Sequence, residues 1–181
     1  MAGPAGKLSV VEYFDLDETL RPMELVYGMV VREPAMPSWD HQLVSARLTA
    51  LLDTHVEERG IGRVSSPVDV VLDVEAALVV QPDVVFISNE RRGIVRDRVW
   101  GAPDLAVEIL SPRTARRDRT VKLAWYRQYG VRECWLVDHR ARTVEVVDFT
   151  SMTPARLFIG DQPMRSYVLP RWKISPARLF A

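Results

Sequence analysis

Two acidic residues stand inside stretches that are otherwise typical of buried β-strands, and they constrain the fold more than any other feature. Asp83 lies in the run LVVQPDVVFI over residues 78–87, and Glu108 lies in LAVEIL over residues 105–110. Burying a carboxylate among apolar side chains costs several kcal/mol unless a cation or hydrogen bonds compensate. With Lys122 soon after them, the two acids predict a divalent-metal site for phosphodiester chemistry.

The alternation of side chains along a strand places Glu108 relative to the core. Leu105, Val107 and Ile109 share one wholly apolar face, so Glu108 points to the other face of the strand. If Asp83 lies near the end of a neighbouring strand, the two carboxylates meet. When two carboxylates lie a few ångströms apart, their repulsion raises the pKa of one of them unless Mg²⁺ neutralises both. Mg²⁺ prefers hard oxygen ligands and keeps several waters, one of which can become the attacking nucleophile.

Lys122 belongs to a helix predicted over residues 114–129, which Gly130 ends. Asp118, Lys122 and the aromatic residues one turn further on share a face by i, i+4 spacing. We expect the lysine to reach toward the strand end that carries Glu108, where it would stabilise the charge of a pentavalent phosphate or orient the attacking water. Spacing alone also fits a plain Asp118–Lys122 helix ion pair worth about 0.3–0.5 kcal/mol.

The remaining patterns predict a mixture of helices and strands. A capping box at Ser9 and Glu12 opens a short helix that ends near Leu16. The other predicted elements are a hairpin over 24–31 turning at Tyr27-Gly28, a long amphipathic helix over 38–59, strands near 68–72, 78–87, 133–138, 143–149 and 156–159, a polar loop over 88–102 and a closing helix over 175–180. Together they predict one α/β (α+β) domain over residues 1–181.

The charge of the chain limits how it can meet nucleic acid. The 181 residues carry a formal net charge of zero, so a general electrostatic attraction to DNA is absent and a local patch must supply it. Between residues 111 and 127 the basic residues outnumber Asp118, the one acid there. They are Arg113, Arg116, Arg117, Arg119, Lys122 and Arg127. This segment is either a phosphate-binding rim or a solvated helix end.

Several classes of protein are disfavoured. No apolar run reaches the roughly 18–20 residues that cross a bilayer, and the first seven residues lack the pattern of a secretory signal. Cys134 is the single cysteine, which rules out an internal disulfide framework. We expect a cytoplasmic protein with no membrane association.

Five segments in a fixed order carry a resemblance to a known family. They are QPDVVF at 81–86, GAPDLAVEILSP at 101–112, RDRTVK at 117–122, YRQYGVRECWLVD at 126–138 and RTVEV at 142–146. The chain resembles the Uma-two family of proteins described as restriction endonucleases, within the PD-(D/E)xK nuclease superfamily. The resemblance covers nearly everything from Glu24 onward. It implies a restriction-endonuclease-like core, which is a central mixed β-sheet flanked by helices, with an N-terminal hairpin and a long helix.

The resemblance also implies roles for particular residues. Asp83 and Glu108 would be the metal-binding acids, with Glu24 as a further acid brought to the metal. The superfamily's usual lysine, two residues after the glutamate, is replaced here by Leu110, and Lys122 is the migrated substitute. His41 matches another recurring position of the family, with a weaker role.

The chain departs from the family where an acid-rich ELxDGE turn is usual. Here residues 24–29 read ELVYGM, so Glu24 is retained and the two further acids are lost. Each candidate residue also has a purely structural interpretation. In that interpretation Asp83 caps a turn, Glu108 forms a structural ion pair, and His41 and His55 lie on a helix surface.

Three functional hypotheses follow. The first is a Mg²⁺-dependent DNA endonuclease, with Mn²⁺ as a substitute, whose catalytic residues are Asp83, Glu108 and Lys122. The second is a catalytically inactive nuclease-fold protein that binds nucleic acid or a protein partner. The third is a metal-dependent hydrolase of another phosphoester. For an enzyme that cuts both strands, a homodimer is a further expectation.

Overall fold

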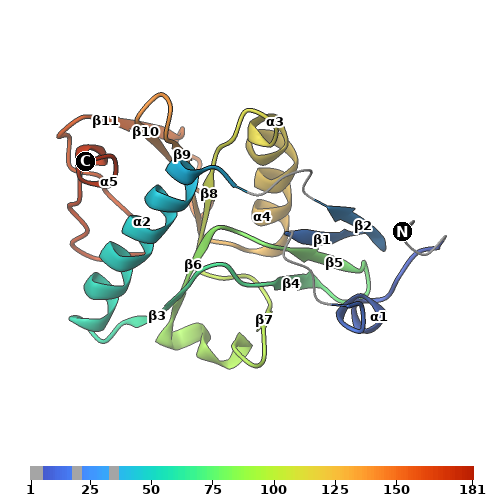
Figure 1. Ribbon diagram of the computed structural model, residues 1–181. Coiled ribbons are helices and arrows are strands. Elements are labelled where there is room, and N and C mark those ends of the chain that lie inside the picture. Colours follow the sequence, from blue (N-terminus) through green and yellow to red (C-terminus); the bar gives the residue numbers. More distant parts are fainter. Residues whose placement is uncertain (1–5, 18–21, 33–36) are drawn as a thin grey trace.

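The computed structural model describes residues 6–17, 22–32 and 37–181 and shows helices packed on two β-sheets (Figure 1). The α-helices are α1 (Val10–Phe14), α2 (Trp39–Glu57), α3 (Ala115–Arg117), α4 (Leu123–Tyr129) and α5 (Pro176–Leu179). This α/β architecture, with mixed sheets flanked by helices, is the one predicted from the sequence.

The larger sheet has the strand order β11-β10-β9-β8-β6-β3. Its strands are β3 (Gly62–Ser65), β6 (Val84–Ser88), β8 (Leu105–Ile109), β9 (Glu133–Asp138), β10 (Thr143–Asp148) and β11 (Arg156–Ile159). Strands β8 and β9 run parallel, and the helical segment between them supplies the crossover. The other pairs are antiparallel, so the sheet is mixed.

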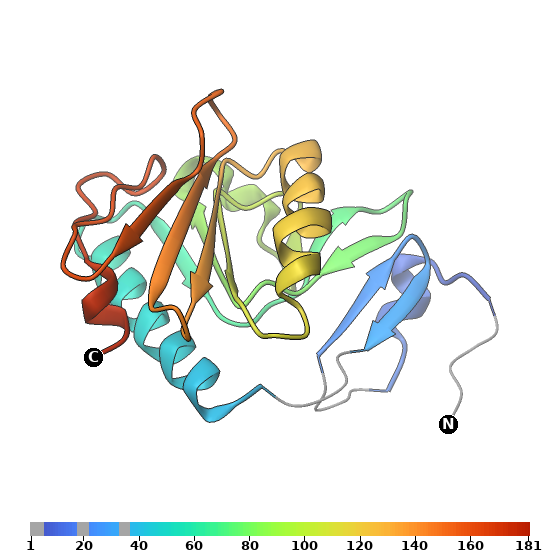
Figure 2. The ribbon, with the colours of Figure 1, turned by 90° about the horizontal axis from the view of Figure 1, so that it is seen from above.

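Helices cover both faces of this sheet (Figure 2). Leu105, Val107 and Ile109 pack in one core cluster with Leu48 and Leu52 of α2. On the opposite face, Ala106 and Leu110 pack with Trp125 and Tyr126 of α4. The predicted alternation along β8 is therefore confirmed, and Glu108 faces α4 rather than α2.

The smaller sheet has the order β2-β1-β5-β4-β7 and carries the N-terminal hairpin. Its strands are β1 (Met23–Val26), β2 (Met29–Arg32), β4 (Val70–Asp73), β5 (Leu78–Val80) and β7 (Val99–Trp100). The hairpin turns at Tyr27-Gly28 as predicted, with both residues at positive φ. Its β1 strand pairs with β5, which brings Glu24 beside residues 78–81.

The prediction of one continuous strand over residues 78–87 is wrong. The run divides into β5 and β6, which belong to different sheets. Pro82 lies at the break, because a proline lacks the N–H that a continuous ladder requires. Asp83 thus stands at the junction of the two sheets rather than within a strand.

Other elements also differ from the predictions. Residues 88–102 are not wholly a loop, because they contain a 3₁₀ helix (Asn89–Ile94) and β7, and β3 was not predicted. His41 and His55 are buried, not surface residues, because α2 packs closely on the sheet and the C-terminal segment. Helix α1 ends at Phe14, slightly before Leu16. No helix in the described part of the chain is long and apolar enough to cross a membrane.

Candidate active site

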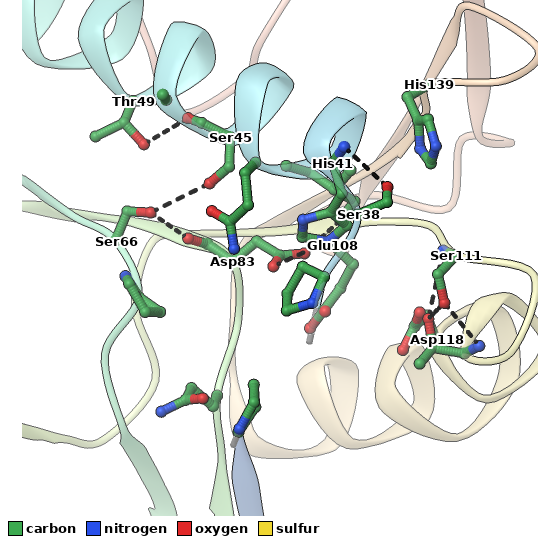
Figure 3. Close-up of a pocket in the computed structure, with 18 of the residues that line it drawn as sticks. Ser38, His41, Ser45, Thr49, Ser66, Asp83, Glu108, Ser111, Asp118 and His139 are labelled. Carbon is green, nitrogen blue, oxygen red and sulfur yellow. Dashed lines mark hydrogen bonds and ion pairs between the residues drawn. The ribbon is translucent and has the colours of Figure 1, made fainter. Parts of the chain in front are cut away.

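One cavity of about 950 Å³ gathers the four residues that the sequence singled out. Asp83, Glu108, Lys122 and Glu24 all line it, although they come from four separate segments of the chain. The face of α2 that begins at Ser38 forms one wall, and the loop after β8 forms another (Figure 3).

Asp83 is fixed against β8 by two hydrogen bonds. The Ile109 amide donates to Asp83 Oδ2 at 2.6 Å, and the Asp83 amide donates to the Val107 carbonyl at 3.0 Å. The second carboxylate oxygen, Oδ1, lies 3.4 Å from His41 Nε2, in the first turn of α2. These contacts tie Asp83 to the strand that carries Glu108, which is more than the capping of a local turn.

Glu108 is buried and bound by two side chains from the helical crossover. Lys122 Nζ donates to Glu108 Oε1 at 3.1 Å and to Oε2 at 3.0 Å. The Tyr126 hydroxyl also donates to Oε1. Lys122 therefore reaches toward β8, as the sequence predicted. Tyr126 is an addition, since the sequence suggested packing for its ring and no role for its hydroxyl.

Glu24 approaches from the hairpin and binds the opposite side of the Lys122 ammonium. Its Oε1 lies 3.0 Å from Lys122 Nζ and accepts a hydrogen bond from the Gln81 amide at 3.1 Å. Its Oε2 forms an ion pair with Arg117. Lys122 thus bridges Glu24 and Glu108, the two glutamates that the sequence assigned to a metal.

The predicted helix over residues 114–129 is interrupted by a π-helical segment, Asp118–Lys122, between α3 and α4. A π-helical turn contains an extra residue, and such turns are frequent at functional sites. It orients both Asp118 and Lys122 inward, and Asp118 Oδ1 lies 3.8 Å from Lys122 Nζ. Asp118 is therefore part of this buried network and not a solvent-exposed helix pair.

The clustering of buried charges alters the acid–base behaviour of the site. Burial raises the pKa of Glu108 to about 8, although Lys122 acts against that rise. Burial disfavours the charged form of Lys122, but Glu108, Glu24 and Asp118 together raise the pKa of its ammonium well above the ordinary value. Burial also opposes the charge of His41, yet its hydrogen bond to Asp83 raises the pKa of the imidazole.

The donor set fits a hard divalent cation. Five carboxylates (Glu24, Asp53, Asp83, Glu108 and Asp118) line the cavity. Lys122 lies among Glu24, Glu108 and Asp118, and Arg117 pairs with Glu24. Mg²⁺ is usually held by one or two carboxylates and retains several waters. In the described ranges, no group of three or more His, Cys, Asp or Glu side chains is arranged to hold a metal ion. Metal binding by Asp83, Glu108 and Glu24 therefore stays a prediction.

The basic segment predicted as a phosphate-binding rim divides into different roles. Lys122 is buried, Arg117 pairs with Glu24, and Arg119 pairs with Glu145. The Arg127 guanidinium lies 5.5 Å from the ring centroid of Phe149. Arg113 does line the cavity, and it is joined there by Arg140 from the β9–β10 turn, which the sequence did not single out.

The sequence did not predict the contacts that two site residues, Tyr126 and His41, make with the acids. Tyr126 lies one helical turn after Lys122, and that spacing was the available signal for its contact with Glu108. The burial of His41 against Asp83 had no local signal, because it depends on where α2 docks.

Comparisons with known proteins agree with this architecture. The structure is similar to the crystal structure of a putative nuclease from Anabaena variabilis, with a TM-score of 0.81 and 20% sequence identity over 96% of this chain and 97% of that one. At this identity the likeness concerns the fold. A comparison with curated proteins finds no match. A family model described as "putative restriction endonuclease" matches residues 10–175. The chain therefore belongs to the Uma2 family, the Uma-two family that its motifs resemble.

Proposed function

We propose that the protein is a Mg²⁺-dependent endonuclease that hydrolyses phosphodiester bonds in DNA. The observation that carries this proposal is the meeting of Asp83, Glu108 and Lys122 in one cavity, in a chain of this family. In hydrolysis, water adds to phosphorus, one phosphorus–oxygen bond to a sugar breaks, and the departing sugar oxygen takes a proton. Each of these changes needs charge stabilisation and a positioned proton donor or acceptor.

Asp83 and Glu108 would hold Mg²⁺, with Mn²⁺ as a substitute. The bound metal would supply charge neutralisation at the phosphate and a water of lowered pKa. The Ile109 amide and His41 position the Asp83 carboxylate. Tyr126 positions Glu108. These partners lie on β8, α2 and α4, so regular elements set the positions of both carboxylates before substrate binds.

Lys122 would stabilise the extra negative charge that develops on the phosphate oxygens. Its ammonium is already charged and held in place by Glu24 and Glu108. A positive charge in a partly water-excluded site interacts more strongly with a developing anion than one in bulk water does. Glu24 and Asp118 would therefore act as positioning residues for the lysine.

A plasmid-nicking assay in Mg²⁺ or Mn²⁺ tests the proposal, with Glu108→Ala as the matched variant. We expect the wild-type protein to nick plasmid and E108A to lose at least about a hundredfold of that rate, the scale of losing a principal electrostatic group. Equal cutting by both proteins would assign the activity to a contaminant and refute the proposal.

Calorimetry tests the metal separately from the cleavage. We expect titration with Mn²⁺ to show binding in the wild-type protein and none in Asp83→Ala. Asp83→Ala leaves the Ile109 amide without its acceptor, so circular dichroism of D83A is the folding control for this titration. Unchanged binding by D83A would exclude the proposed ligand set.

One observation favours a second candidate, a catalytically inactive nuclease-fold protein that binds nucleic acid or a protein partner. Both oxygens of Glu108 accept hydrogen bonds from Lys122, and Oε1 accepts a further one from Tyr126. A buried carboxylate satisfied in this way is stable without a metal. Binding of DNA by the wild-type protein, with no nicking in either metal, would support this candidate over the first.

A further inference from the structure

The cavity that holds the acidic residues is elongated and follows α2. Eight residues of this helix and its cap line it, at spacings of three or four along the sequence: Ser38, His41, Gln42, Ser45, Ala46, Thr49, Ala50 and Asp53. At 1.5 Å of rise per residue, the span from Ser38 to Asp53 is about 22 Å. The cavity is therefore a groove along one helix face, and Asp83 and Glu108 lie in its wall (Figure 3).

The α2 wall allows a ligand to approach closely. Ala46 and Ala50 are exposed and carry only a methyl group, so the helix surface there is shallow. The hydroxyls beside them are already engaged: Ser45 Oγ lies 3.4 Å from Ser66 Oγ, and Thr49 donates to the Ser45 carbonyl at 2.8 Å. The α2 wall therefore leaves room for a ligand but offers it few specific polar contacts.

Two exposed arginines line the same groove from loops on other elements. Arg113 follows β8, and Arg140 lies in the β9–β10 turn, where the Asp138 carboxylate accepts hydrogen bonds from the Arg140 and Ala141 amides at 3.0 and 2.9 Å. Neither guanidinium has a hydrogen-bond or ion-pair partner among the residues that the structure describes. Free guanidinium groups suit the phosphates of a nucleic acid, which they bind through two parallel hydrogen bonds.

We propose that this groove takes an unpaired nucleic-acid strand, which lies along α2 while Arg113 and Arg140 bind its phosphates. The inference rests on the proposed function, because it names the substrate class of the same site. It assigns the phosphate contacts to these two arginines rather than to the whole basic segment around them.

The dimensions favour an unpaired strand over a duplex. A cavity of about 950 Å³ is at the upper end of the range that encloses drug-sized ligands, roughly 300–1,000 Å³, which corresponds to a few nucleotides. Glu108 is only 3% exposed, so a scissile phosphate must enter the groove to reach it. An unpaired strand, either in a single-stranded substrate or in a locally opened region of a supercoiled plasmid, can bring a phosphate to this depth without carrying a paired second strand into the groove.

The chemistry of the walls predicts how binding depends on salt. The lining residues include His139 but no phenylalanine, tyrosine or tryptophan among those that the structure describes. Stacking of bases on aromatic rings, the usual source of affinity for single strands, is therefore small here. Phosphate contacts dominate, and each one adds about 0.7 to the slope of log affinity against log salt for a single strand.

Fluorescence anisotropy with a labelled single-stranded oligonucleotide and its duplex tests the inference, in Ca²⁺ in place of Mg²⁺. We expect the wild-type protein to bind the single strand at least about tenfold more tightly than the duplex. Arg113→Gln and Arg140→Gln should each weaken single-strand binding and lower the salt slope by about 0.7. Arg116→Gln is the control, since Arg116 is exposed in the same segment but does not line the groove.

A groove-filling pair of variants tests the path along α2 independently of charge. Ala46→Trp places an indole in the groove at an exposed position and should abolish single-strand binding. Leu43→Trp, exposed on α2 but outside the groove, should leave it unchanged. Circular dichroism establishes that both variants fold.

The outcomes separate this inference from the proposed function. Equal binding of duplex and single strand, no measurable binding of the single strand, or equal effects of the groove and control variants would overturn the inference. Single-strand binding that depends on the groove, without cleavage in Mg²⁺ or Mn²⁺, would support the groove and refute the nuclease instead.

Discussion

Lys122 is the residue on which the buried charges of the site depend. Its ammonium lies 3.0 Å from Glu24 Oε1, 3.0 Å from Glu108 Oε2 and 3.8 Å from Asp118 Oδ1. A buried ion pair adds little net stability compared with apolar side chains of the same volume. Loss of one partner is costly, because the remaining charge stays buried and unpaired. The single lysine therefore stabilises three carboxylates at once.

We predict that Lys122→Met lowers the free energy of unfolding by about 3–5 kcal/mol, the usual effect of removing one partner of a buried ion pair. Glu108→Gln added to it should restore part of that loss, since one of the unpaired carboxylates becomes a neutral amide. Urea unfolding of the wild type, both single variants and the double variant measures the coupling. Strictly additive effects would show that Lys122 and Glu108 do not interact.

The raised pKa of Glu108 predicts a dependence of stability on pH. The folded-state value of about 8 exceeds the ordinary value of 4.5, so the folded protein binds this proton more tightly than the unfolded chain does. The resulting stabilisation is complete below about pH 4.5 and is lost as the pH rises to about 8. Glu108→Gln lacks this titration and is the reference.

Urea unfolding of metal-free protein at several pH values between 5 and 8 measures this effect. The unfolding free energy of the wild type should fall relative to E108Q by on the order of 1 kcal/mol per pH unit. A difference that stays constant over this window would mean that Lys122 keeps Glu108 ionised throughout.

At the scale of secondary-structure elements, two irregular segments orient the site. The break at residues 81–83 lets the chain pass from the smaller sheet to the larger one, and it leaves Asp83 against β8. The π-helical segment Asp118–Lys122 interrupts the α-helix, and Asp118 and Lys122 at its two ends are both buried. The regular helices and strands form the scaffold, and the functional side chains Asp83, Asp118 and Lys122 lie at its two irregular segments.

The pairing of β3 with β6 leads to a prediction at Gly62. A Cβ atom added there would lie 2.2 Å from the Ile87 carbonyl oxygen and 2.7 Å from the Phe86 ring, closer than atoms can approach. We expect Gly62→Ala to destabilise the fold by about 1–3 kcal/mol, the range for overpacked positions. Gly93→Ala is the matched control, because a Cβ at Gly93 meets nothing within 4 Å. Thermal unfolding of both variants measures the difference, and equal midpoints would contradict the predicted clash.

At the scale of the whole molecule, the cavity lies where separate parts of the fold meet. The hairpin supplies Glu24, α2 supplies His41, the larger sheet supplies Glu108, and the crossover supplies Lys122. Folding must therefore be complete before the acids converge. If a cation binds there as we propose, it would stabilise the assembled state, because the unfolded chain offers no comparable site.

We predict that Mg²⁺ raises the thermal unfolding midpoint of the wild-type protein and not that of Asp83→Ala. At free Mg²⁺ about a hundredfold above the dissociation constant, the stabilisation is about 2.7 kcal/mol. Differential scanning fluorimetry over a Mg²⁺ series, with NaCl added at matched ionic strength as the control, measures it. An equal rise in both proteins would indicate a general salt effect and no site at Asp83.

Local sequence patterns predicted many of the regular elements and identified the unusual acids. Alternation along β8 predicted that Glu108 points away from the apolar face of that strand, and helical spacing predicted that Asp118 and Lys122 share a face, because both patterns depend on local backbone geometry. The strands β9, β10 and β11 and the long helix α2 were predicted within two residues of their ends for the same reason.

The partners of the charged residues, by contrast, depend on the tertiary packing of the described residues. Arg117 and Arg119 lie close together in the sequence with Arg113, yet they pair with Glu24 and Glu145, from remote segments, while Arg113 remains open to the cavity. His41 became buried against Asp83 because α2 docks there. Local patterns carry no information on such partners, since they are set by how the sheets and helices pack.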